Sequence, residues 1–144
     1  MNRDQLLADL QSFGSESDSA ATELADRGDR AALPAILRAI LTDCGFEIIP
    51  AQKIAAFIRL ADAAIVPILV ERLESLDEAG LEHDAGDVGD EFWRIQTAVR
   101  RILVGIGPSV VLPVREALAG TENAFAKECL GDALSELEDA GPKA

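Results

Sequence analysis

One stretch decides the fold of this 144-residue chain: Ile65-Val66-Pro67-Ile68-Leu69-Val70. Two near copies of it are Ala32-Leu33-Pro34-Ala35-Ile36-Leu37 and Val111-Leu112-Pro113-Val114-Arg115-Glu116-Ala117-Leu118. The three prolines are 33 and then 46 residues apart, and the second spacing also becomes 33 when 13 residues are removed. A period in the thirties with helical patterning is typical of stacked helix pairs, the α-solenoid architecture. The glycine- and acid-rich residues 77–90 are the predicted insertion between repeats.

Apolar residues elsewhere recur with the helical period, and no segment alternates with the period of a strand. The pattern predicts helices over residues 2–13, 20–27, 31–42, 51–62, 64–76, 90–106, 109–119 and 122–138. Asn2 and Ser109 are expected to cap the first and seventh of these helices. Residues 15–19 are predicted to be a polar break, and residues 44–50 a linker.

These elements predict an all-α protein, a right-handed α-solenoid of about seven to eight short antiparallel helices. We expect a single domain over residues 1–144. Its two ends, residues 1–19 and 122–144, are predicted to be caps, because an open solenoid end would expose apolar surface.

The chain carries a net charge of −13, with 26 acidic against 13 basic residues. Nucleic acids and anionic lipids repel such a surface, so neither nucleic acid nor membrane is expected as a partner. The N-terminus lacks a signal-peptide pattern and no apolar run reaches the length of a membrane span, which predicts a cytoplasmic protein. Cys44 and Cys129 are expected to be buried thiols, and one long-range disulfide is the alternative.

The repeated segments resemble HEAT repeats: a helix with alanine, arginine and leucine, a turn, then a helix that opens on an apolar-proline-apolar pattern. The nearest likeness is the short bacterial type of phycobilisome lyases and small scaffold proteins. Residues 99–118 match best, residues 24–41 match well, and residues 57–73 are shortened at the turn. The resemblance implies the architecture and no activity, because repeat residues are framework residues. No bilin-handling motif is present, so no lyase residue is carried over.

The acidic stretch 77–91 holds seven carboxylates and no lysine or arginine. Asp84, Asp87 and Asp90 offer oxygen ligands for a divalent cation, but their spacing does not fit an EF-hand loop. A solvated insertion is the favoured interpretation, and partner recognition by the insertion is a further hypothesis.

No catalytic set is predicted. The single histidine, His83, is far in sequence from both cysteines, so neither a Cys-His pair nor a zinc site has suitable ligand spacing. We therefore expect no enzyme activity, no cofactor and no metal.

Trp93 is the single tryptophan, and it follows Phe92 directly. Adjacent helical side chains cannot both face the core, so an inward Phe92 would leave Trp93 exposed as a binding anchor. The alternative packs Trp93 over a neighbouring helix. Arg94, Arg101 and Arg115 are expected either to form a basic strip or to pair with the excess of acids.

The second helices of successive repeats usually line one surface of a solenoid. The candidate partner-binding residues are accordingly Arg38, Glu71, Asp84, Asp87, Asp90, Trp93, Arg115 and Glu116.

The predicted function is a non-enzymatic protein-protein interaction module, an adaptor or scaffold, that binds a protein with a basic surface. The chain itself is expected to be a monomer or weak homo-oligomer. An acidic inhibitor or immunity-type protein that neutralises a basic toxin or nuclease is the alternative, and a lyase-like or chaperone role is the least favoured.

Overall fold

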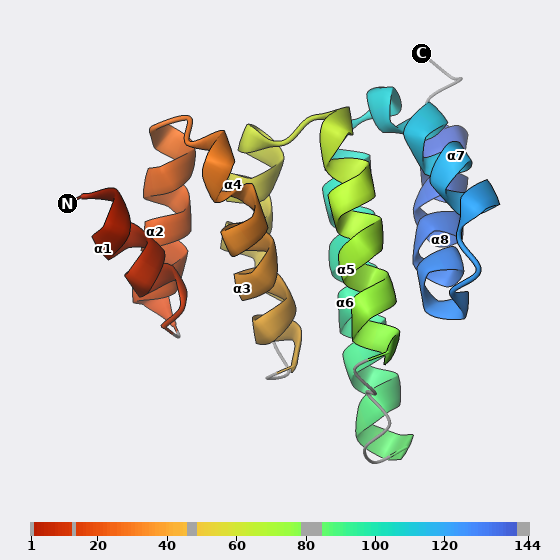
Figure 1. Ribbon diagram of the computed structural model, residues 1–144, viewed down its shortest axis with the longest axis horizontal. Coiled ribbons are helices and arrows are strands. Elements are labelled where there is room, and N and C mark those ends of the chain that lie inside the picture. Colours follow the sequence, from red (N-terminus) through yellow and green to blue (C-terminus); the bar gives the residue numbers. More distant parts are fainter. Residues whose placement is uncertain (1, 13, 46–48, 79–84, 141–144) are drawn as a thin grey trace. The chain divides into compact units, whose positions relative to one another are not determined.

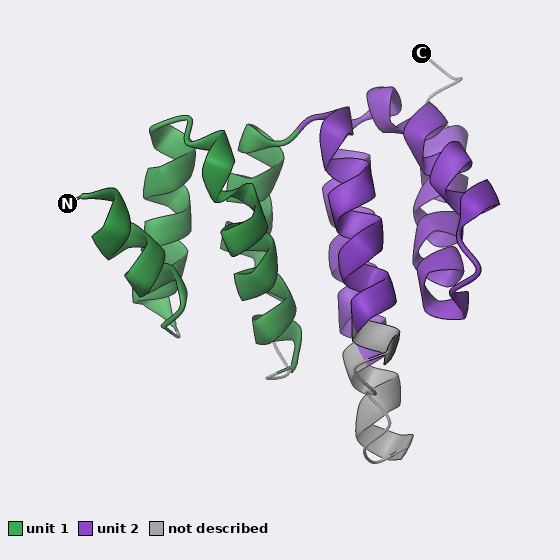
Figure 2. Ribbon diagram, in the orientation of Figure 1, with its two compact units in different colours: residues 1–61 green, residues 62–144 purple. Residues whose placement is uncertain are grey.

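The computed structural model describes residues 2–12, 14–45, 49–78 and 85–140 (Figure 1). Within these residues every regular element is a helix, which confirms the predicted all-α class. The chain divides into two compact units, Met1–Ala61 and Asp62–Ala144 (Figure 2).

Unit 1 is built from four α-helices and one 3₁₀ turn among its described residues. They are α1 (Arg3–Leu10), α2 (Ser15–Asp26), η1 (Arg30–Ala32), α3 (Leu33–Gly45) and α4 (Ala51–Leu60). Helix α2 packs against α1 and α4, and α3 packs against α4. Asn2 caps α1 as predicted, because its side-chain oxygen accepts the Gln5 N–H at 2.8 Å. The fully buried core includes Leu10, Leu24, Ile36, Leu37, Ile40 and Phe57.

Unit 2 has the same kinds of element in its described part. They are η2 (Ala63–Ile65), α5 (Val66–Glu78), α6 (Ala85–Ile106), η3 (Pro108–Val110), α7 (Val111–Gly120) and α8 (Ala124–Ala140). Helix α8 packs against α5, α6 and α7, and α5 also packs against α7. The fully buried core includes Leu69, Leu73, Ile95, Val99, Ile102, Leu103, Val114 and Leu130.

The three proline-containing stretches share one local structure. Each of the helices α3, α5 and α7 follows directly on a 3₁₀ turn, and its proline lies within its first three residues. A proline costs least in this position, because the N–H groups of a first turn have no partner within the helix. The sequence repeat is therefore a repeat of structure at the level of turn and helix start.

The structure corrects the predicted break at residues 15–19. Helix α2 begins at Ser15, and Gly14 precedes it with a φ of +88°. Glu16 and Asp18 lie in its first turn, where carboxylates favour a helix because they face the positive end of its dipole. Ser17 is buried and donates its hydroxyl to the Leu10 carbonyl at 2.7 Å, so the serine joins α2 to α1.

Three further boundaries differ from the sequence-based predictions. Helix α3 continues to Gly45, so the predicted linker at residues 44–50 is shorter. Residues 77–78 belong to α5 and residues 85–90 to α6, so the predicted insertion is helical at both ends, and residues 79–84 lie outside the described chain. Ser109 is not a cap: Pro108 opens η3, and Gly107, with φ +104°, takes the capping position.

Candidate functional site

A groove of about 410 Å³ lies between α5 and α7 in unit 2. Its apolar lining residues are Val66, Pro67, Val70, Pro113 and Ala117. Three carboxylates, those of Glu71, Glu74 and Glu116, complete the lining. Among the described residues, no lysine or arginine lines the groove, so its character is apolar and acidic.

Helical register explains why these residues meet. Glu71 follows Pro67 by four positions, and Glu116 follows Pro113 by three, so each glutamate shares a helix face with its proline. Because α5 packs against α7, the two proline faces border one groove. The same repeated stretch therefore contributes both walls.

The three carboxylates differ in their surroundings. Glu74 is partly buried, and its carboxylate accepts the Thr121 hydroxyl at 2.6 Å. Thr121 in turn accepts the Asn123 N–H at 3.2 Å, which ties Glu74 to the start of α8. Glu71 and Glu116 are exposed, and neither forms an ion pair with the described part of the chain. These two carboxylates are the ones available to a cation from outside.

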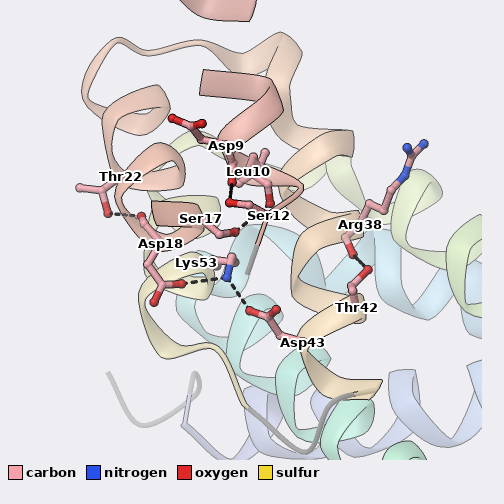
Figure 3. Close-up of polar contacts among 10 residues, drawn as sticks. All are labelled: Asp9, Leu10, Ser12, Ser17, Asp18, Thr22, Arg38, Thr42, Asp43 and Lys53. Carbon is pink, nitrogen blue, oxygen red and sulfur yellow. Dashed lines mark hydrogen bonds and ion pairs between the residues drawn. The ribbon is translucent and has the colours of Figure 1, made fainter. Parts of the chain in front are cut away.

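The structure brings only some of the predicted binding residues together. Glu71 and Glu116 lie together at the groove. Arg115 pairs with Glu138 on α8, which agrees with the alternative that it pairs with the excess of acids. Arg38 is exposed on α3 in unit 1, and Figure 3 shows its side chain pointing away from the buried polar residues there.

Trp93 is 59% exposed on α6. Its neighbour Phe92 turns inward, and the rings of Phe92 and Phe125 have centroids 4.3 Å apart. The alternative in which Trp93 is packed over a neighbouring helix is therefore wrong, and the exposed arrangement is the one observed. Trp93 is not part of the groove lining.

The acidic candidates fall at the limit of the described chain. Asp87 and Asp90 belong to the helical backbone of α6. Asp84 and His83 lie outside the described residues. Within the described residues, no group of three or more histidine, cysteine, aspartate or glutamate side chains is placed to hold a metal ion.

Sequence reasoning missed a buried lysine in unit 1. Lys53 on α4 is 1% exposed, and its ammonium donates to Asp18 at 2.8 Å and to Asp43 at 2.5 Å (Figure 3). Asp18 comes from α2 and Asp43 from α3, so the three residues join three helices. Among the described residues, every buried side-chain nitrogen or oxygen has a hydrogen-bond partner.

The chemistry of Lys53 is that of a structural cation. Burial alone lowers the pKa of a lysine, but the hydrogen bonds to Asp18 and Asp43 outweigh it, and the pKa of Lys53 is raised above its ordinary 10.5. The ammonium therefore stays protonated at neutral pH and has no lone pair for attack on a substrate. The charged residues of this cluster hold helices together.

A second groove, of about 480 Å³, lies between α1 and α2 in unit 1. Only Leu6 and Ala20 are apolar in its lining. Arg27 also lines this groove and pairs with Glu23 at 2.9 Å, so the Glu23 carboxylate is already neutralised within the protein. The α5/α7 groove offers more apolar wall and two exposed carboxylates, which makes it the better candidate for binding.

Both cysteines are buried thiols, as predicted, and they lie in different units. Burial raises the pKa of the Cys129 thiol to about 12, and the charges of Glu128 and Asp132 act in the same direction. Cys129 is therefore protonated and weakly nucleophilic at neutral pH.

In the described part of the chain, no single helix has the length and apolar character to cross a membrane. The bent pair Phe92–Ile106 and Pro108–Gly120, with 109° between its members, meets the requirement by length and composition only. No family model, curated protein or solved structure matches this chain.

Proposed function

We propose that this chain is a non-enzymatic protein-binding module, an adaptor or scaffold built as a HEAT-like α-solenoid. Its binding surface is the α5/α7 groove, and its partner is a protein with a basic surface. The observation that carries the proposal is that the repeated proline stretches of α5 and α7 border one groove, with two exposed carboxylates that form no ion pair with the described residues.

Two features support this proposal. The recurring turn and helix start is what stacked helix pairs require, because each pair needs the same local geometry to bury its face against the next. The net charge of −13 favours encounter with basic partners, and the groove places part of that charge beside apolar wall.

The test compares two variants of equal charge in affinity capture from native lysate. Glu71→Lys with Glu116→Lys reverses the exposed groove carboxylates. Glu128→Lys with Asp139→Lys reverses two exposed carboxylates on α8 and serves as the control. We expect a protein retained by the wild type to be lost from the groove variant and kept by the control. Both variants should keep the helical circular dichroism of the wild type.

Retention of the same proteins by the wild type and the groove variant would contradict the proposed surface. The acidic groove also suits the second candidate function, an inhibitor of a basic toxin or nuclease. In that case the captured partner has nuclease or toxin activity, and adding wild-type chain lowers that activity while the groove variant does not.

A further inference from the structure

We propose that the α5/α7 groove receives an arginine side chain of the partner. The aliphatic carbons lie along the apolar wall, and the guanidinium lies at the carboxylates of Glu71 and Glu116. This inference rests on the proposed function and names the residue type that the same groove recognises.

The lining of the groove offers both the apolar surface and the negative charge that an arginine side chain needs. Val70, Ala117 and the two prolines offer apolar surface, whereas the carboxylates border the same space. Arginine carries an apolar stem that packs on such surface and a charged head that stays at its polar edge. A purely apolar side chain would leave the carboxylates uncompensated, and an acidic one would be repelled by them.

Arginine is preferred over lysine because of the number and placement of its donors. A guanidinium has five N–H donors in a plane and pairs with carboxylates through two parallel hydrogen bonds. It is also less strongly hydrated than an ammonium, so it loses less on entering a partly apolar groove. Because Glu74 is already engaged by Thr121, Glu71 and Glu116 are the carboxylates that the guanidinium meets.

Exposed apolar side chains flank both carboxylates. Leu112 is 63% exposed and precedes Glu116 by four positions, and Ile68 is 39% exposed and precedes Glu71 by three. Residues at these spacings are neighbours on a helix surface. The residues next to the arginine in the partner are therefore apolar, so that they cover Leu112 and Ile68.

The test uses a five-residue peptide, acetyl-Gly-Leu-Arg-Leu-Gly-amide, and a copy in which citrulline replaces arginine. Citrulline keeps the shape and removes the charge. Amide chemical shifts of isotope-labelled full-length protein are followed during titration. With the arginine peptide we expect the largest shifts in residues 68–74 and 114–117, and with the citrulline peptide we expect these shifts to be lost.

The two charge-reversal variants provide the energetic readout. We expect Glu71→Lys with Glu116→Lys to weaken peptide binding by about tenfold or more, and Glu128→Lys with Asp139→Lys to weaken it by less than about threefold. Equal losses in both variants, or shifts spread over the exposed carboxylates of both units, would overturn the arginine assignment. If the lysate partner is still lost from the groove variant in that case, the proposed function stands and only the arginine assignment fails.

Discussion

Lys53 and Asp43 form an ion pair of 2.5 Å inside unit 1, with side chains that are 1% and 8% exposed. The same ammonium bonds Asp18, which is 30% exposed, at 2.8 Å. An ammonium removed from water is tolerated only when its charge and hydrogens are satisfied, and two carboxylates from two other helices satisfy them here. The pairing therefore fixes how α2, α3 and α4 pack together.

Replacing this lysine should be costly. Lys53→Met leaves Asp43 buried without its cation, and we expect the free energy of unfolding to fall by about 3–5 kcal/mol. Urea unfolding followed by circular dichroism at 222 nm measures the change, because the signal follows the helices of the whole chain. The matched control is Arg59→Met on the same helix, which breaks an exposed pair with Asp26 and should cost about 1 kcal/mol or less.

A double variant separates lost pairing from lost packing. Lys53→Met with Asp43→Leu removes the buried charge on both sides, while the partly exposed Asp18 keeps access to water. It should recover most of the stability lost in Lys53→Met. A double variant as unstable as the single one would show that the ion pair is not the source of the loss.

The helical pattern of the sequence does place Lys53 and Asp43 among core positions. It is recognised only if a charged residue is accepted as a core residue. Lys53, Ala56, Phe57 and Leu60 follow the spacing of one helix face, and the last three are buried. Asp43 likewise follows Ile36 and Ile40 on α3. Periodicity places Lys53 on the core face, but only the three-dimensional pairing with Asp18 and Asp43 explains why a charge is tolerated there.

The groove could be predicted in part. The prolines marked the starts of α3, α5 and α7, because the chemistry of a first turn is local. Glu71 and Glu116 followed from their places after these prolines. Pairing between helices is a tertiary property, so the sequence did not show that Arg115 pairs with Glu138 or that Thr121 holds Glu74.

The hydrogen bond between Thr121 and Glu74 gives a second prediction. Thr121→Val keeps the shape but removes the 2.6 Å bond to the carboxylate and the acceptor for the Asn123 N–H. We expect a loss of about 1.5–3 kcal/mol in urea unfolding, the range for hydrogen bonds to charged groups. Thr42→Val is the control, since the hydroxyl of the exposed Thr42 donates to the carbonyl of Arg38 one turn earlier on the same helix. Equal losses in the two variants would contradict the assigned role of Thr121.

Truncation of the neighbours Phe92 and Trp93 should change the free energy of unfolding by very different amounts. Phe92→Ala removes a ring packed on Phe125 and should lower the free energy of unfolding by about 2–3 kcal/mol. Trp93→Ala removes a side chain that is 59% exposed and should change it by about 0.5 kcal/mol or less. Thermal or urea unfolding by circular dichroism is the measurement, because Trp93→Ala abolishes the only tryptophan fluorescence. A loss of unfolding free energy for Trp93→Ala as large as that for Phe92→Ala would mean that Trp93 is a core residue.

The raised pKa of Cys129 predicts that the folded chain loses stability at alkaline pH. Its pKa is about 12 in the folded chain, against an ordinary value of 9.0, so between these values the folded state keeps a proton that the unfolded state releases. The stabilising contribution is complete below pH 9 and falls as pH rises towards 12, by at most about 1.4 kcal/mol per pH unit. Lys53, whose pKa is also raised, adds a loss of the same sign above its ordinary value of 10.5.

The variant Cys129→Ala isolates the thiol in this pH dependence. Urea unfolding at pH 8 and pH 11 should show a smaller decrease in stability for the variant than for the wild type, because only the wild type has the Cys129 proton to lose. The native thiol should also react slowly with iodoacetamide at pH 8 and quickly once the chain is unfolded in urea. Parallel pH dependence in the two proteins, together with fast alkylation of native Cys129, would show that this thiol is not held protonated by burial.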